Sequence, residues 1–490
     1  MRASGILLHI TSLPSPYGIG TLGTAAFDFI DFLRQAGQSY WQILPIGPTG
    51  VGDSPYQSCS AFAGNPYLID LDDLIRRRLL EPSEVQDANR GSCAEKVDYG
   101  AQYVRKFAVL EKAYRRGIRT EQTAFSDFRD NNPWVEDYAL YMALKRKFGL
   151  LPWYQWPAAA AERQKDAISR YRDELSDDIG FFAFVQYLFF GQWERLHAYA
   201  AENGIRIIGD IPIYVPMDSV EVWQSPELFQ LDAAYRPTAV AGVPPDAFTE
   251  DGQLWGNPLY DWARMKKDGY HWWKNRVQAA AKCFDVIRID HFRGLESYWS
   301  VPGDAKTARE GQWMPGPGLP LLRALKKACP DTAFIAEDLG VITPQVRELQ
   351  KRSGFPGMKV LEFAFDGDGN NAYLPHNAAG NCVYYTGTHD NETLAQWYEA
   401  LSPSARGQVT AYFGLNPQEG ELRGILRGGL TSAAELFIAQ MQDWMELGAQ
   451  ARMNTPGLLS DANWSWRLTK MPDAALAEEI RRLTALSGRI

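Results

Sequence analysis

Short apolar runs alternate with longer amphipathic stretches along most of this 490-residue chain. The alternation is most regular after residue 284, where four strand-like runs occupy 284–292, 332–339, 358–365 and 382–388. Helical patterns fill the intervals, as at 319–329 and 343–353. Parallel strands need a crossover of a dozen or more residues between them, usually a helix. The pattern therefore predicts a parallel sheet covered by helices.

The earlier part of the chain supplies further elements of the same kind. Strand-like runs lie at 4–10, 39–46 and 205–215, and the weakest of all, at 452–454, is taken as the last. Helical patterns are predicted at 24–38, 179–203, 259–283, 392–401, 433–447 and 474–487. Eight strands alternating with helices predict an α/β fold of the (β/α)₈ TIM-barrel type, with 1–490 forming a single catalytic domain.

Two segments interrupt this order. From 66 to 177 the patterns are mostly helical and polar, which predicts a large helical subdomain inserted after the second strand. From 216 to 258 the chain is rich in Pro and Gly, which predicts a long loop inserted after the third strand, over the active site.

Composition excludes several classes of partner. The net charge of −9 and the lack of a basic run argue against nucleic acid. No apolar run reaches 18 residues and the apolar stretch near the start is too short for a signal peptide, so we expect no membrane association. Five scattered cysteines without a CxxC pair indicate a reducing compartment, and we expect a cytoplasmic protein.

Charged residues gather at the predicted strand ends. Active sites of such barrels lie at the C-terminal ends of the strands. The side chains expected there are Asp210, Arg288, Asp290, Glu337, His389 and Asp390. A structural ion pair explains Arg288 and Asp290 as well as a functional site does. Four carboxylates around one mouth repel each other, however, and this favours function over stability.

Two carboxylates in different environments are the groups that glycoside chemistry uses. Asp290, beside Arg288, is expected to stay ionised and to attack an anomeric carbon. Glu337 follows the apolar Phe-Ile-Ala at 334–336, so its pKa is expected to be raised and to suit an acid. Asp390 then remains to hold sugar hydroxyls and to favour the transition state. The alternative for Glu337 is that it only caps the following turn.

Neither a metal nor an organic cofactor is expected. His9, His291 and His389 have no short metal-binding spacing, and the acidic run at 366–370 lacks the Gly and Glu of a calcium loop.

Aromatic residues make up 13% of the chain. Their rings suit stacking on sugars, although most are expected in the core.

Nine motifs give the chain a specific resemblance over its whole length. They are LPSPYGIG at 13–20, GDSPYQ at 52–57, GNPY at 64–67, GDIPI at 209–213, AGVPPD at 241–246, GQLWGNP at 252–258, RIDHFRG at 288–294, AEDLG at 336–340 and THDN at 388–391. The chain resembles the 4-α-glucanotransferase (amylomaltase, or disproportionating enzyme) family of the α-amylase clan. Around Ala462 it looks less typical, and nothing is carried over to that loop.

The resemblance implies a transferase that moves segments of α-1,4-glucans and maltooligosaccharides without a metal or cofactor. It implies that Asp290 is the nucleophile, Glu337 the acid/base and Asp390 the transition-state carboxylate. The substrate-binding residues that it implies are Tyr56, Asp210, Phe248, Gln253, Trp255, Arg288 and His389. Two other functions stay open: an α-glucan hydrolase of the same clan, and a non-catalytic glucan-binding barrel.

Overall fold

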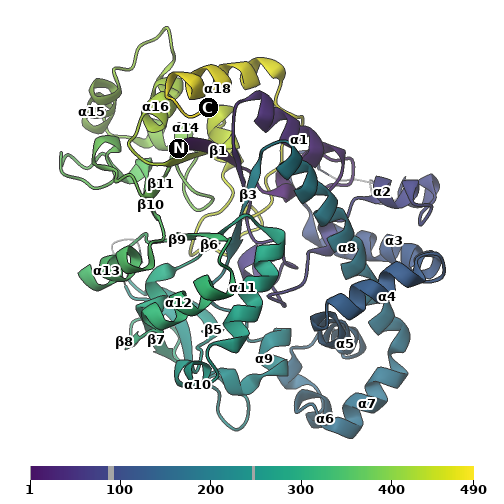
Figure 1. Cartoon of the computed structure of the whole chain (residues 1–490). Coiled ribbons are helices and arrows are strands. Elements are labelled where there is room, and N and C mark those ends of the chain that lie inside the picture. The colour runs from purple at the N-terminus through teal and green to yellow at the C-terminus, as the bar shows by residue number, and fades with distance from the viewer. Residues whose placement is uncertain (1, 87–92, 246–248) are drawn as a thin grey trace.

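Eight parallel strands form the centre of the molecule (Figure 1). The computed structural model describes residues 2–86, 93–245 and 249–490. In sheet order the strands are β10 (Gly357–Val360), β11 (Cys382–Tyr385), β12 (Leu436–Gln440), β1 (Ala3–Leu7), β2 (Tyr40–Gln42), β3 (Arg206–Ile211), β6 (Val286–Ile289) and β9 (Ala333–Ala336). The N–H of Ala336 donates to the carbonyl of Pro356 at 2.9 Å and joins β9 to the start of β10. The sheet thereby closes into the predicted barrel.

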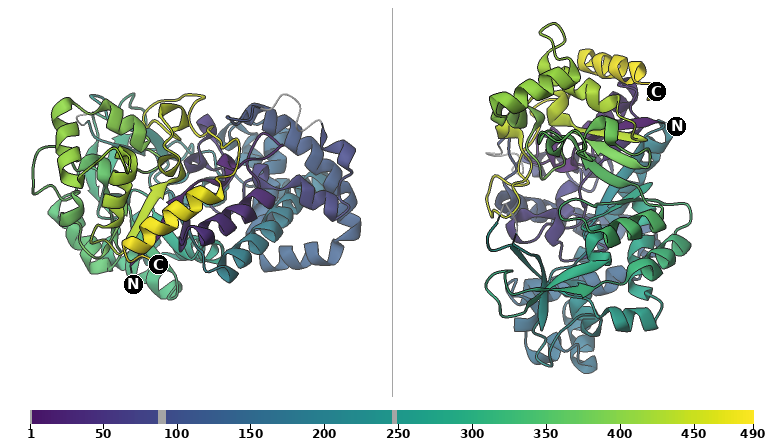
Figure 2. Two further views of the ribbon diagram at one scale, coloured as in Figure 1. Left: turned by 90° about the horizontal axis from the view of Figure 1, so that it is seen from above. Right: turned by 90° about the vertical axis from the view of Figure 1, so that its left-hand side faces the viewer.

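Helices connect successive strands and cover the outside of the barrel. They are α1 (Thr24–Gln35), α8 (Ser176–Glu202), α10 (Trp262–Lys267), α11 (His271–Cys283), α12 (Gly318–Ala328), α13 (Pro344–Ser353), α14 (Leu394–Ala400), α15 (Pro403–Phe413), α16 (Glu421–Leu430), α17 (Met441–Trp444) and α18 (Ala474–Leu486). The C-terminal α18 lies beside α1, where Gln38 donates to the hydroxyl of Thr484 at 3.0 Å (Figure 2). The two ends of the chain thus complete one helical layer.

The prediction of the last strand was wrong. Residues 452–454 form no strand, and the eighth strand is β12, inside the stretch 433–447 that was predicted as a helix. Leu436–Gln440 is a short apolar run whose periodicity does not separate a buried strand from a buried helix. Pairing with β1 on one side and β11 on the other selects the strand.

Backbone conformation breaks a second predicted helix. The stretch 259–283 contains α10 and α11 instead of one helix. Between these two helices, Gly269 has φ 70° and Tyr270 has φ 60°. A right-handed helix does not accommodate positive φ values, so the helix ends there.

The close packing of β3 and β6 also has a local cause: a Cβ at Gly209 would come within 2.2 Å of the Phe284 ring. Asp210 follows directly, so this close packing helps to place the end of β3.

The two interruptions of the barrel contain different structures. Residues 66–177 hold α2 (Leu71–Arg76), α3 (Tyr99–Thr120), α4 (Gln122–Asn131), α5 (Trp134–Lys147), α6 (Ala158–Ala161) and α7 (Lys165–Glu174), against which α8 packs. Treating this segment as a subdomain remains our proposal. Among the described residues, no helix is both long enough and apolar enough to span a membrane.

The described part of the segment 216–258 contains regular secondary structure as well as loops. It contains α9 (Val220–Gln224), β4 (Ala239–Val243) and β5 (Gln253–Pro258). With β7 (Ser297–Pro302) and β8 (Gln312–Pro315), which the sequence did not suggest, these strands form an antiparallel sheet in the order β5-β4-β7-β8. This small sheet connects the exits of β3 and β6, because its strands follow both of them in the chain.

Candidate active site

Three neighbouring strands bring four of the predicted residues to one edge of the barrel. Asp210 on β3 is paired in register with Arg288 on β6. Asp290 and Glu337 each lie one residue beyond their strands, and their N–H groups donate to Ile211 and Ile289 at 3.1 Å. The pairing thus continues one residue past the strand ends. It fixes the backbone from which both carboxylates project.

The guanidinium of Arg288 joins two carboxylates. Its Nη1 donates to Oδ2 of Asp210 at 2.5 Å and to Oδ1 of Asp290 at 3.0 Å. Burial lowers the pKa of Arg288, but the two carboxylates outweigh it and hold that pKa well above its ordinary value. Burial raises the pKa of Asp210, and Arg288 opposes this. The side chain of Asp290 is 28% exposed. Arg288 therefore orients this carboxylate while part of it stays accessible.

Glu337 occupies the second key position. Its Oε2 accepts from the N–H of His291 at 2.8 Å and its Oε1 accepts from the N–H of Leu339 at 2.9 Å. Burial, with the negative charge of Asp290, raises the pKa of Glu337 to about 7 against the opposing effects of Arg288 and the two N–H groups. Near neutral pH this carboxyl therefore has both protonation states available, which suits proton donation and acceptance.

The backbone of His291 helps to hold Glu337. His291 has φ 48° and ψ 48°, the left-handed conformation, which is rare for a residue with a side chain. This turn directly follows Asp290 and aims the His291 N–H at Glu337. Burial lowers the pKa of His291 to about 4, so its ring is neutral at physiological pH. The ring of Trp255 meets it edge-on, with 4.8 Å between centroids.

An aromatic group lies on the other side of Asp210. The hydroxyl of Tyr56 donates to Oδ2 of Asp210 at 2.7 Å. The Tyr56 ring stacks on His389 with 5.2 Å between centroids, and Trp464 lies 5.7 Å from Tyr56 and 5.9 Å from His389. Sequence reasoning missed Trp464, because it belongs to the C-terminal loop that gave no signal. These rings connect the ends of β3 and β11.

Asp390 is held by residues from the chain after β12. Asn454 Nδ2 donates to Oδ1 of Asp390 at 2.7 Å, and Arg452 Nη2 donates to the Asp390 carbonyl at 3.0 Å. His389 Nε2 lies 3.4 Å from the same Oδ1. The Asp390 side chain remains 44% exposed. The stretch 452–454 therefore does reach the mouth of the barrel, although as a loop that supports Asp390 rather than as a strand.

The residues predicted on the inserted loop are only partly placed. Gln253 and Trp255 lie on β5, where the indole N–H of Trp255 donates to Oε1 of Gln253 at 3.1 Å. Phe248 lies outside the described residues. Among the residues that are described, no group of three or more His, Cys, Asp or Glu side chains is arranged to hold a metal ion.

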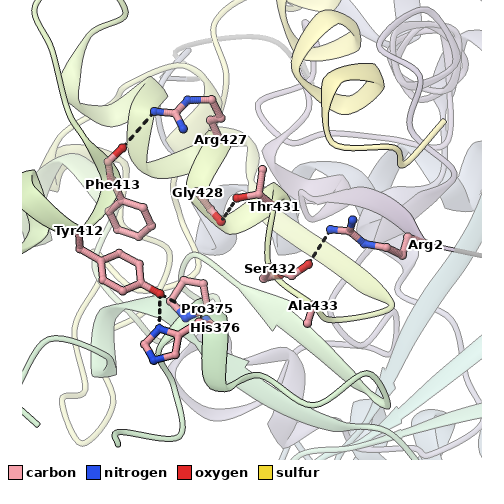
Figure 3. Close-up of a pocket in the computed structure, with 10 residues that line it drawn as sticks. All are labelled: Arg2, Pro375, His376, Tyr412, Phe413, Arg427, Gly428, Thr431, Ser432 and Ala433. Atoms are coloured by element: carbon pink, nitrogen blue, oxygen red, sulfur yellow. Dashed lines mark hydrogen bonds between the residues drawn. The ribbon is translucent and has the colours of Figure 1, made fainter. Parts of the chain in front are cut away.

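A pocket of about 450 Å³ lies at the end of the barrel opposite to the carboxylates described above (Figure 3). Arg2, Ser432 and Ala433 line it, and they precede β1 and β12. Its arginines are already engaged: Arg2 donates to carbonyls at the end of α16, and Arg427 makes two bonds to Glu419. In barrels this end contributes to stability rather than to catalysis. It contains none of the predicted site residues.

Known proteins match the chain over nearly its full length. The family described as 4-alpha-glucanotransferase matches residues 8–472. The 4-alpha-glucanotransferase of Clostridium butyricum is 47% identical over 486 residues, covering 98% of this chain and 100% of that protein. The Thermus thermophilus 4-alpha-glucanotransferase is 48% identical over 498 residues, covering 99% and 98%. An amylomaltase from Streptococcus agalactiae, solved in complex with acarbose, has a TM-score of 0.97 at 41% identity, with 100% of both chains covered. This chain belongs to the 4-alpha-glucanotransferase family.

Proposed function

We propose that this protein is a retaining 4-alpha-glucanotransferase that acts on α-1,4-glucans and maltooligosaccharides. The observation that carries the proposal is the arrangement of Arg288, Asp290 and Glu337 at one edge of the barrel. It pairs a carboxylate fixed by a guanidinium with a carboxyl whose pKa burial raises to about 7. Family membership and the likeness to an amylomaltase support the same function.

In the first step, Asp290 attacks the anomeric carbon of the donor glucan and the bond from that carbon to the glycosidic oxygen breaks. Glu337 gives its proton to this oxygen, which leaves as the 4-hydroxyl of the released glucan. The product is a glycosyl ester on Asp290, and Glu337 is now ionised. Arg288 stabilises Asp290 as an anion before attack and as the leaving group later.

In the second step, the 4-hydroxyl of an acceptor glucan attacks the same carbon. Glu337 takes the proton from that hydroxyl, and the bond between the sugar and Asp290 breaks. Asp390, held by Asn454, is the group that we assign to the positive charge on the sugar ring in both transition states. One glycosidic bond is broken and one is formed, so the number of reducing ends does not change.

The sugar beside the broken bond is assigned to the residues around Asp210. Tyr56 and Arg288 already hold the Asp210 carboxylate, and His389 stacks on Tyr56. Gln253 and Trp255 on β5 are assigned to a neighbouring sugar, together with Phe248. Aromatic faces beside a few fixed polar groups suit the apolar faces and hydroxyls of glucose.

The proposal is tested by incubating the protein with maltotriose. Transfer gives glucose together with longer oligosaccharides at a constant number of reducing ends, whereas hydrolysis raises that number. NMR of the longer products is expected to show the α-configuration at the newly formed glycosidic bond, as retention requires. Asp290→Asn is the control and is expected to abolish turnover. Hydrolysis without longer products would identify a hydrolase, and full activity in Asp290→Asn would exclude this nucleophile.

The cysteines bear on where the protein works. All five are free: Cys59, Cys93, Cys283, Cys329 and Cys382. Unpaired cysteines are typical of reducing compartments, and this supports the assignment to the cytoplasm.

A further inference from the structure

A long groove separates the helical insertion from the barrel. Its volume is about 1260 Å³, more than the ~300–1,000 Å³ usual for small-molecule sites. Figure 1 shows α4, α5 and α8 on one side and α9 and α11 on the other. Tyr56 and Asp210 line the same groove. It is therefore continuous with the sugar-binding part of the active site, while the proposed chemistry uses no other residue of its lining.

Two tryptophans line this groove from opposite walls. Trp134 begins α5 and Trp272 lies on α11, and both are partly exposed. Trp134 stacks with Phe62 at 6.3 Å between centroids and meets Phe190 edge-on at 5.7 Å. Trp272 packs against Tyr260 at 5.6 Å, and the Arg276 guanidinium lies 5.4 Å from its ring. Packing thus fixes both rings in place, so little conformational entropy is lost when they bind a ligand.

The polar residues of the groove indicate which ligand fits. Amide side chains from both walls line it, namely Asn131, Asn132, Gln224, Asn275 and Gln278. Acidic residues outnumber basic ones in the lining: the cations are Arg276 and Lys282, whereas the acids are Glu194, Asp210, Glu221, Glu227, Asp268 and Asp331. A negatively charged ligand is therefore disfavoured. Fixed aromatic rings beside amides suit a neutral ligand with many hydroxyls.

We propose that this groove is a second binding site for an α-1,4-glucan chain, separate from the position at which bonds are broken. The inference rests on the proposed function, which brings such chains to Tyr56 and Asp210. A long glucan held between Trp134 and Trp272 stays near the catalytic carboxylates after each transfer. Its effective concentration at the site rises without any new contact to the reacting sugar.

The test compares long and short substrates in the double variant Trp134→Ala/Trp272→Ala. Removal of two aromatic contacts is expected to raise KM for amylose at least about fivefold. Disproportionation of maltotriose, which is too short to occupy both sites, is expected to stay within about twofold of the parent. Soluble starch in a native gel slows the migration of proteins that bind it. When migration is compared with that in a starch-free gel, the variant is expected to be slowed less than the parent. Tyr154→Ala, which removes a 44% exposed ring outside the groove, is the matched control.

A second variant covers the case in which the double variant does not fold. Asn275→Trp places a large side chain at an exposed position of the lining and is expected to lower starch retardation in the same way. Unchanged starch retardation and amylose KM in a folded groove variant would overturn the inference and leave a groove that holds only solvent. Loss of the maltotriose reaction in the parent protein would instead overturn the proposed function.

Discussion

Asn454 donates a hydrogen bond of 2.7 Å from its side-chain amide to Oδ1 of Asp390. Asn454 is buried, whereas 44% of the Asp390 side chain is exposed. Arg452 donates to the carbonyls of both residues, at 2.9 Å to Asn454 and 3.0 Å to Asp390. The loop after β12 therefore orients a carboxylate that follows β11, and Asp390 depends on it for its position.

Replacement of Asn454 is expected to reduce turnover more than binding. Asn454→Ala removes a hydrogen bond to a charged group, a contact worth about 1.5–3 kcal/mol, so kcat should fall roughly tenfold to a hundredfold. Initial rates over a range of maltotriose concentrations measure this. Asn416→Ala, at a distant position whose side chain bonds within its own turn, is the control. A rise in KM with unchanged kcat would mean that Asn454 binds substrate rather than positioning Asp390.

The activity is expected to fall as pH rises through about 7. The Glu337 carboxyl must be protonated to act as the acid, and its pKa is raised to about 7, mainly by burial. Above this pH a growing fraction of molecules has lost that proton. The basic limb of a plot of kcat/KM against pH should therefore have its midpoint near 7. A profile that stays flat to pH 9 would contradict the role of Glu337.

Removal of the Arg288 charge is expected to destabilise the fold and to abolish activity. Arg288 is 3% exposed and compensates both Asp210 and Asp290. Arg288→Met leaves two buried or half-buried carboxylates without a counter-charge, which costs about 3–5 kcal/mol. Urea unfolding at pH 7 measures the loss. Arg206→Met, in which an exposed cation at the start of β3 is lost, should change stability by less than about 1 kcal/mol.

Arg293 is expected to act on Glu337 at a distance. Its Nη1 donates to the carbonyl of Val341, and its guanidinium lies 3.7 Å from the centroid of Trp313 on β8. These contacts tie the loop that follows Glu337 to the exit of β6. Arg293→Met should lower kcat about tenfold, with KM little changed, because it loosens this loop. If circular dichroism shows that the folded fraction falls as much as the activity does, Arg293 has only a structural role.

Trp255 is expected to favour sugar over water as the acceptor. A transferase must position the acceptor and exclude solvent from the covalent intermediate. Trp255→Ser removes the ring that meets His291 next to Asp290. Hydrolysis is measured as new reducing ends formed from amylose, and transfer as disproportionation of maltotriose. The ratio of the hydrolysis rate to the transfer rate should therefore rise. An equal fall of both rates would show that the ring supports stability. From the sequence alone, Phe248→Ser is likewise expected to weaken acceptor stacking and to alter the balance of products.

Most of the barrel was predictable because its signals are local. Each of the first seven strands combines an apolar run with a following helix, and the structure has a strand that overlaps each predicted range. The carboxylates at 210, 290 and 337 follow from the same reading, because the C-terminal ends of parallel strands meet at one edge. The family resemblance drawn from the motifs is confirmed by the matching family and relatives.

By itself, the sequence determined the barrel class, the family and the carboxylates that end its strands, since these depend on short patterns and fixed motifs. Only the tertiary structure decided that 436–440 is the closing strand, since this apolar run forms a strand by pairing with β1 and β11. It also brought Asn454 to Asp390 and Trp464 to Tyr56. These pairs lie far apart in the chain, and contacts of that kind arise from packing the whole barrel, which no local pattern records.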